Sequence, residues 1–111
     1  MDKITDFLNN EFKPLQVGDS ITDAENLFLD FNYSHFPVLE QDIYIGSIAK
    51  DDVEILPVAT SINEHKFGLH RFFVRSTMNW FDVFEEFSKN HTNILPVLDD
   101  KNQYVGFYEL D

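Results

Sequence analysis

The sequence contains no cysteine, few basic residues and no long apolar run. Without cysteine, a disulfide scaffold and a thiolate metal site are both excluded. Lys and Arg number 8 against 20 Asp and Glu, which gives a formal net charge of −12. Because phosphate groups bind basic surfaces, we expect neither nucleic acid nor an anionic membrane as a partner. No stretch approaches the ~20 apolar residues of a membrane span, and the N-terminus, MDKITDFLNNEF, lacks the apolar run of a signal peptide, so we expect a cytoplasmic protein.

Motifs for catalysis and metal binding are missing as well. The sequence has no GxSxG, P-loop or GxGxxG motif, and its carboxylates are scattered in a way that is typical of solvated helix faces. The four histidines form no i, i+4 pair and no HExxH motif. We therefore expect neither an enzyme nor a metal site.

The chain does contain an internal repeat. Pro37-Val38-Leu39 recurs as Pro96-Val97-Leu98, and Tyr44-Ile45-Gly46 recurs, after one inserted residue, as Tyr104-Val105-Gly106. The offset of the first motif also pairs three residues of the two halves: Asp23 with Asp82, Ala24 with Val83, and Phe28 with Phe87. The alternative is a chance likeness between two strand-rich segments. Several matches in one order favour a duplicated unit.

Each half predicts the same order of elements. Ser20 and Asp23 have the spacing of a capping box, and Asn79 and Asp82 take the same positions in the second half. Apolar residues follow each cap at helical spacing, so each helix has one face to bury. These residues are Ala24, Leu27, Phe28 and Phe31 in the first half, and Trp80, Val83, Phe84 and Phe87 in the second.

Two strands follow each helix. Residues 36–39 and 94–98 are apolar runs that contain a proline, and because proline cannot donate to a ladder we expect edge strands or strands that begin at the proline. A polar turn leads to second strands at residues 44–48 and 103–108. Residues 15–17 and 72–74 are expected to add a strand to the sheet of the opposite half. Ile4, Phe7, Leu8 and Phe12 predict a short amphipathic N-terminal helix that packs on the core or, alternatively, binds a partner.

The duplicated pattern of capped helix, Pro-Val, turn, and hydrophobic residue before glycine resembles the tandem pair of cystathionine beta-synthase (CBS) domains. It is also similar to short CBS proteins related to acetoin-utilisation protein B. The resemblance covers about residues 14 to 111 and implies an α/β (α+β) fold. In that fold two repeats, each helix-strand-strand-helix, pack through their sheets with pseudo-twofold symmetry. We expect an N-terminal helix over residues 1–13, repeat 1 over 14–66, and repeat 2 over 67–111, with repeat 2 truncated before its last helix.

The resemblance further implies a cleft between the repeats that holds an adenosine-containing ligand such as AMP, ADP, ATP or S-adenosylmethionine. In this family a hydroxyl residue after the second strand meets phosphate, and an Asp three residues later accepts hydrogen bonds from the ribose. The first repeat reads Gly46-Ser47-Ile48-Ala49-Lys50-Asp51-Asp52, so Asp52 falls on the ribose position and Ala49 on the hydroxyl position. The other reading of Asp52 is an acid that suits the start of a helix. The expected site residues are Leu15, Ser34, His35, Phe36, Pro37, Ile48, Ala49 and Asp52.

The second repeat does not keep this chemistry. Glu109 stands at the hydroxyl position, where a carboxylate repels phosphate, and the chain stops at Asp111, before the ribose position. His35 is expected to line the first cleft or, alternatively, to be a partly buried structural histidine. We therefore predict a regulatory module that senses an adenosine-type ligand in the first cleft, forms a homodimer and requires no cofactor. The alternative is a structural dimerisation module that binds no nucleotide.

Overall fold

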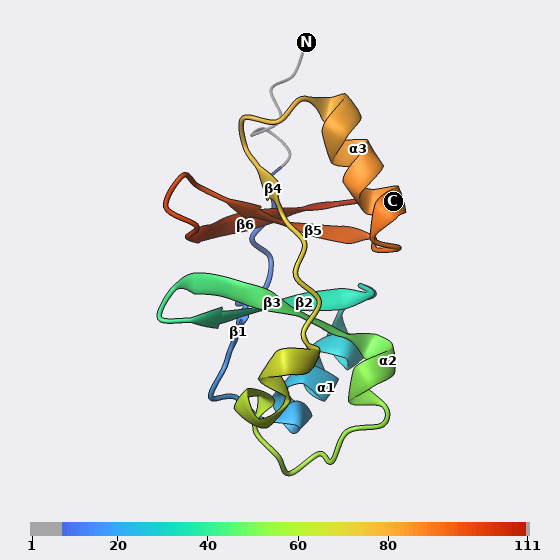
Figure 1. Ribbon diagram of the computed structural model, residues 1–111. Helices are drawn as coiled ribbons and strands as arrows, with labels where there is room; N and C mark the ends of the chain where they lie inside the picture. The colour runs from blue at the N-terminus through green and yellow to red at the C-terminus, as the bar shows by residue number, and fades with distance from the viewer. Residues whose placement is uncertain (1–7, 111) are drawn as a thin grey trace.

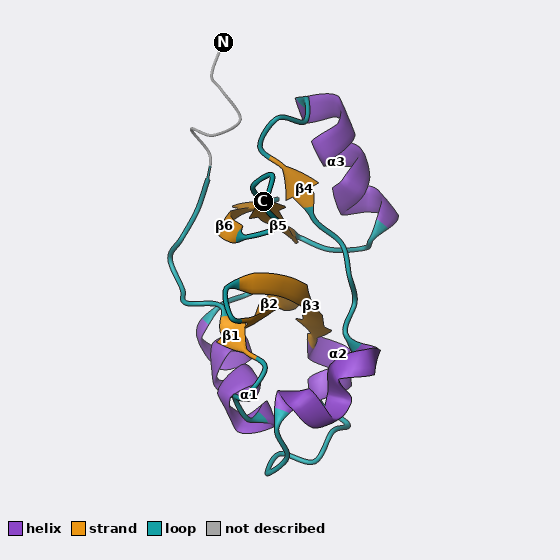
Figure 2. Cartoon of the chain, turned by 60° about the vertical axis from the view of Figure 1, so that its left-hand side comes forward, coloured by secondary structure: helices purple, strands orange, loops and turns teal. Residues whose placement is uncertain are grey.

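The computed structural model describes residues 8–110 and shows two sheets that face each other, with helices on their outer sides (Figures 1 and 2). Each sheet has three strands, in the order β1-β2-β3 and β4-β5-β6. The first half of the chain forms β1 Leu15–Gln16, α1 Ile21–Asp30, β2 His35–Glu40, β3 Ile43–Ala49 and α2 Lys50–Val53. A 3-10 helix, η2 Ile62–Gly68, leads to β4 Val74–Arg75, α3 Trp80–Lys89, β5 Ile94–Leu98 and β6 Tyr104–Glu109.

The duplication predicted from the sequence is present in the backbone. β2 pairs antiparallel with β3 and places Val38 opposite Gly46, while β5 pairs antiparallel with β6 and places Val97 opposite Gly106. Each ladder shifts its register at the residue after that valine. The predicted mixed α/β fold with two similar halves is confirmed.

Both helix caps form as the sequence predicts. The Ser20 Oγ accepts from the Asp23 N–H at 3.1 Å, and the Asp23 carboxylate accepts from the Ser20 N–H at 3.0 Å, which completes a capping box. At the start of α3 the Asn79 side chain accepts from the Asp82 N–H at 2.9 Å. These bonds satisfy N–H groups that have no partner inside the helix.

The prediction that the proline-containing strands lie at sheet edges or begin at the proline is wrong. β2 and β5 are the central strands of their sheets, and each begins two residues before its proline. The short strands β1 and β4 pair only with Val38-Leu39 and Val97-Leu98, so the ladder begins just after Pro37 and Pro96. Each proline is therefore tolerated, because its nitrogen, which has no hydrogen to donate, lies beyond the end of β1 or β4.

The prediction that residues 15–17 and 72–74 join the opposite sheet is also wrong, since β1 and β4 pair in parallel with the sheet of their own half. The exchange between halves occurs earlier in each segment. Asn9 and Phe107 exchange backbone hydrogen bonds of 2.8 and 3.0 Å, and His70 and Ser47 exchange bonds of 2.8 and 2.7 Å. Of the predicted N-terminal helix, residues 1–7 lie outside the described residues, and residues 8–13 carry this bridge and no helix.

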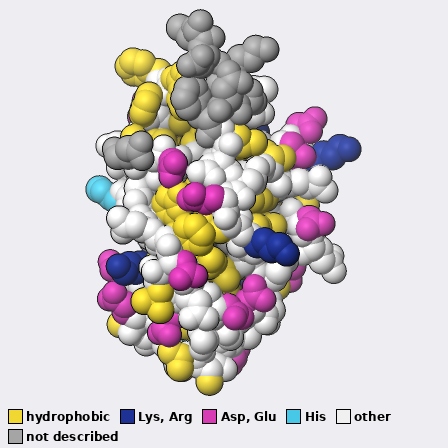
Figure 3. All heavy atoms as spheres, turned by 180° about the vertical axis from the view of Figure 1, so that it is seen from behind, with side chains coloured by type: hydrophobic (Ala, Val, Ile, Leu, Met, Phe, Trp, Pro, Cys, Tyr) yellow, Lys and Arg dark blue, Asp and Glu magenta, His cyan; other side chains and the backbone are white. Residues whose placement is uncertain are grey.

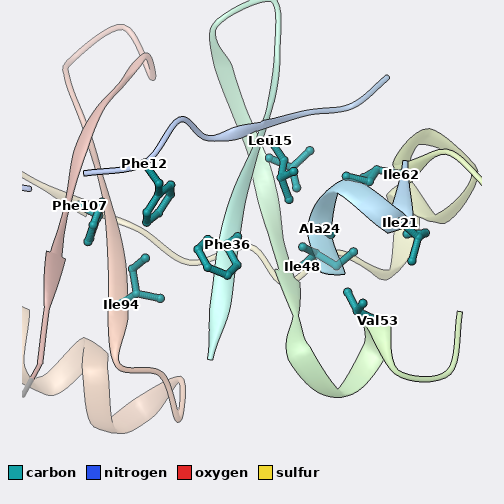
Figure 4. Packing of buried hydrophobic residues seen from close by; sticks show 11 residues of the cluster. Phe12, Leu15, Ile21, Ala24, Phe36, Ile48, Val53, Ile62, Ile94 and Phe107 are labelled. Atoms are coloured by element: carbon teal, nitrogen blue, oxygen red, sulfur yellow. The ribbon is translucent and has the colours of Figure 1, made fainter. Parts of the chain in front are cut away.

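The core has a part between the two sheets and a part between each sheet and its helices. Phe12, Phe36, Ile94 and Phe107 lie between the two sheets, as Figure 4 shows, and the ring centroids of Phe12 and Phe107 are 4.7 Å apart. A second group lies between the first sheet and its helices: Ile21, Ala24, Ile48, Val53 and Ile62. The inter-sheet group joins the halves, because it takes side chains from both sheets and from the segment before β1.

The surface is acidic with interspersed apolar patches. Figure 3 shows acidic side chains spread between apolar ones on one face, with few basic groups. Within residues 8–110 no helix has the length and apolar character needed to cross a membrane.

The chain segments around Asn9 and His70, which bridge to the sheet of the opposite half, are called the exchanged segments. Two glycines allow these segments to lie against the sheets. Gly46 has φ +150°, and a Cβ added to it would lie 2.8 Å from the Cβ of Leu69. Gly106 has φ +149°, and a Cβ there would lie 2.8 Å from the Cγ of Leu8. Both the backbone conformation and the contact require glycine at these equivalent positions.

We predict that Gly46→Ala lowers the free energy of unfolding by about 1–3 kcal/mol, because it adds backbone strain and displaces Leu69. Urea denaturation followed by circular dichroism measures the change. Gly18→Ala is the matched control, since a Cβ at Gly18 meets nothing within 4 Å, and it should change the free energy by no more than about 1 kcal/mol. Equal effects of the two substitutions would contradict this account.

Candidate functional site

A cleft of about 490 Å³ lies where the two halves meet, near the C-terminal end of β3. Its lining comes from the start of β2, the end of β3, the first turn of α2, the exchanged segment before β4 and the residues that follow α3. The lining residues are Ser34, His35, Ala49, Lys50, Asp51, Asp52, His70, Asn90 and His91. The cleft therefore exists only when both halves are folded together.

Reciprocal hydrogen bonds between the halves fix one wall of this cleft. The Asn93 side-chain oxygen accepts from the Ser34 N–H at 2.8 Å, and the Ser34 Oγ accepts from the Asn93 N–H at 3.2 Å. The carbonyl oxygens of the same two residues accept from the N–H groups of Lys50 and Leu110, each at 3.0 Å. This symmetry fixes Ser34 and the start of α2 relative to each other.

Asp52 lies in the first turn of α2 with its carboxylate at the cleft. Its Oδ2 lies 2.8 Å from Nε2 of His70, and both side chains are about half exposed, at 40% and 49%. The backbone of His70 is held against Ser47 by the two bonds of the exchanged segment. The carboxylate is therefore present, accessible and paired with an imidazole.

His35 forms the floor of the cleft. Only 9% of its surface is exposed, its Nδ1 lies 2.7 Å from the Ser34 Oγ, and its ring meets the rings of His70 and Phe72 edge-on at 5.6 and 5.1 Å. Burial lowers the pKa of His35 to about 4, and the charge of His70 lowers it further, while the carboxylates of Asp52 and Asp51 oppose the shift. His35 is therefore neutral at physiological pH and is a hydrogen-bonding group on the floor of the cleft.

The structure brings together four of the eight expected site residues: Ser34, His35, Ala49 and Asp52. Ile48 lines an adjoining apolar hollow of about 290 Å³ that it shares with Asp52. Phe36 and Pro37 are buried and do not line the cleft. Leu15 lines a separate hollow beside Lys13. Both readings of His35 apply, since it is buried and also lines the cleft.

Sequence reasoning did not find the residues that complete the cleft. His70, Asn90 and His91 come from the second half of the chain and from the segment that precedes it. One sequence signal was available for His70. It directly follows Leu69 and precedes a short expected strand, as Asn9 follows Leu8 and precedes the strand at residues 15–17.

At the equivalent junction on the other side, the Tyr33 hydroxyl lies between two carboxylates. The Tyr33 hydroxyl donates to Glu109 at 2.6 Å and also contacts the Glu11 carboxylate, and its ring lies 5.4 Å from that of Phe107. Burial and the two carboxylates raise the pKa of Tyr33 well above its usual value. Two carboxylates around one hydroxyl leave this junction unsuited to phosphate.

Within the described part of the chain, no group of three or more His, Cys, Asp or Glu residues is arranged to hold a metal ion.

We predict that His35 lowers the free energy of unfolding in mild acid. Because its pKa is about 4 in the folded chain and about 6.5 when unfolded, the unfolded state binds more protons between these values. The contribution is fully present above about pH 6.5 and is lost as the pH falls towards about 4. Between pH 7 and 4.5, wild type should lose about 2–3 kcal/mol more unfolding free energy than His35→Ile.

Isoleucine is the matched replacement, because Ile94 occupies the equivalent position in the second half. Both proteins share every carboxylate, so the difference between their urea midpoints at several pH values isolates His35. Parallel pH curves would show that His35 is not buried in its neutral form.

Comparison with known proteins agrees with this architecture. The sequence matches the CBS domain over residues 4–54 and 69–110. The fold is similar to the CBS domains of a transcriptional regulator from Streptococcus pneumoniae, at 19% identity and a TM-score of 0.84, covering 98% of this chain and 93% of that one. It is also similar to a CBS domain pair/ACT domain protein from Thermotoga maritima, at 19% identity and a TM-score of 0.86, covering 98% and 90%.

A third similar structure is the cytosolic domain of the Mg²⁺ channel MgtE in complex with ATP, at 15% identity and a TM-score of 0.79. The match covers 97% of this chain and 46% of that one. Comparison with curated proteins gives no match. With two matched repeats that face each other through their sheets, the chain belongs to the CBS domain family, whose paired repeats serve as regulatory modules.

Proposed function

We propose that the chain is a regulatory module that senses an adenosine-containing ligand in the cleft at Asp52. One observation carries this proposal: an accessible carboxylate lies in a cleft that both halves of the chain line. A carboxylate accepts two hydrogen bonds from the vicinal hydroxyls of a ribose, and such charge-assisted bonds are stronger than neutral ones. The adjoining apolar hollow at Ile48, Leu56 and Leu69 offers further space for a base.

The charges of the cleft favour the nucleoside part of the ligand over its phosphates. Ala49 has no hydroxyl to meet a phosphate, and Asp51 adds a second negative charge beside Asp52. Lys50 is the one lysine or arginine among the lining residues of this cleft. AMP, ADP, ATP and S-adenosylmethionine thus share a nucleoside that the site can hold, and we expect affinity to fall as phosphates are added.

Ligand binding would act by population shift. A ligand that contacts both halves favours the arrangement of the repeats in which those contacts form, by no more than its difference in affinity for the two arrangements. We further propose that the module works as a homodimer in the cytoplasm, in line with the cytosolic domain to which its fold is similar.

The alternative function is a structural dimerisation module without a ligand. The absence of a hydroxyl at Ala49 and the carboxylate at Glu109 favour it, because both remove contacts to phosphate. Light scattering tests the dimer common to both functions, and a strictly monomeric protein would contradict it.

We predict that adenosine, AMP, ADP, ATP or S-adenosylmethionine raises the melting temperature in a thermal shift assay. At a ligand concentration tenfold above Kd the folded state gains about 1.4 kcal/mol, which corresponds to about 4–8 °C. Asp52→Ala should abolish the shift because it removes the ribose acceptor.

Asp51→Ala is the matched control, since Asp51 lines the same cleft from the preceding position, and it should keep the shift. Binding that survives in Asp52→Ala would remove the proposed ribose contact. No shift with any of the five ligands at millimolar concentration would leave the structural module as the function.

A further inference from the structure

The Asp52 carboxylate is already engaged by a side chain of the protein itself. His70 directs its Nε2 to Oδ2 of Asp52 at 2.8 Å, the geometry of a charge-assisted hydrogen bond. An imidazole N–H and a ribose O–H are both donors that need the same carboxylate. A ribose diol that uses both carboxylate oxygens therefore competes with the imidazole for Oδ2.

The surroundings of His70 restrict how it can leave. Its backbone N–H and carbonyl are both bonded to Ser47, at 2.8 and 2.7 Å, so the chain itself is fixed against β3. On one side its ring meets the ring of His35, which is buried and hydrogen-bonded to Ser34. Release of Oδ2 therefore comes from rotation of the His70 or the Asp52 side chain about its own bonds, with the backbone unchanged.

The opposite junction repeats this arrangement with other residues. Asn9 occupies the position equivalent to His70, because it pairs with Phe107 as His70 pairs with Ser47. Its side-chain nitrogen donates to the Glu109 carboxylate at 3.4 Å. In both junctions the exchanged segment thus directs an N–H donor to a carboxylate of the facing half.

We infer that His70 is an internal competitor that holds the Asp52 carboxylate and must release it before the ribose hydroxyls of a nucleoside bind. This inference rests on the proposed function of the cleft. It makes His70 a positioning residue that lowers affinity by the fraction of time for which Asp52 is paired. It also makes ligands that lack the ribose diol insensitive to His70.

The test is calorimetric titration of wild type and His70→Ala with adenosine, which carries the diol and no charge. His70→Ala should bind adenosine about two- to fivefold more tightly, the range expected for a half-exposed ion pair. The affinity for 2′,3′-dideoxyadenosine should be the same in both proteins. Asn9→Ala is the matched control, since Asn9 occupies the position equivalent to His70 at the other junction and is absent from the lining of this cleft, and it should leave adenosine affinity unchanged.

Equal or weaker adenosine binding by His70→Ala, with wild type binding normally, would overturn the inference and leave the proposed function intact. A tightening that dideoxyadenosine shares would overturn it too, because the gain would not involve the diol. Adenosine binding by neither protein would instead refute the proposed function. If His70→Ala does not fold, His70→Leu keeps more of the side-chain volume without the N–H donor and carries the same expectations.

A ligand-free measurement tests the pair itself. Ring-nitrogen NMR of the unliganded protein should show a proton on Nε2 of His70, and Asp52→Asn should change the signal of that nitrogen while Asp51→Asn does not. An unprotonated Nε2, or equal effects of the two substitutions, would remove the competitor whatever the titrations give.

Discussion

The structure depends on the close approach of each exchanged segment to the sheet of the opposite half. Gly46 and Gly106 make that approach possible, since a Cβ on either would meet Leu69 or Leu8 at 2.8 Å. The bridges that follow, at His70 and Asn9, tie each sheet to the segment that enters the other half. Phe12 then continues from one segment into the space between the sheets. The halves therefore stabilise each other through backbone bonds and a shared core.

The same symmetry makes the two junctions comparable position by position, and their side chains differ. Thr92 stands in the first junction where Tyr33 stands in the second, and Ala49 stands where Glu109 stands. The small Ala49 lines the cleft at Asp52, while Tyr33 and Glu109 bond to each other at the other junction. Among the described residues, a duplicated backbone thus carries different chemistry at its two junctions because its side chains are not duplicated.

Sequence patterns predicted the elements well and the site in part, for a physical reason. Helix caps, apolar periodicity and the repeated Pro-Val depend on neighbours in the chain, so the two halves and their order could be predicted. Asp52, Ser34 and His35 followed from motif positions on one repeat. His70 and His91 could not, because they reach the cleft only through the exchange of segments and the docking of two halves. Leu15 was placed in the site by the family resemblance, whereas it lines a separate hollow beside Lys13.

The anchoring of His70 also constrains how the cleft can influence the rest of the chain. The exchanged segment is fixed at Ser47, and two residues after His70 the carbonyl of Phe72 accepts from the buried Tyr44 hydroxyl at 2.8 Å. Rotation of the His70 side chain therefore leaves that backbone in place. Asp52, in contrast, lies on α2, a helix of four residues whose Val53 is buried in the core that α1 shares. Under the proposed function, a ligand that takes the carboxylate from His70 would thus act on α2 and α1, which lie on the outer side of the first sheet (Figure 1).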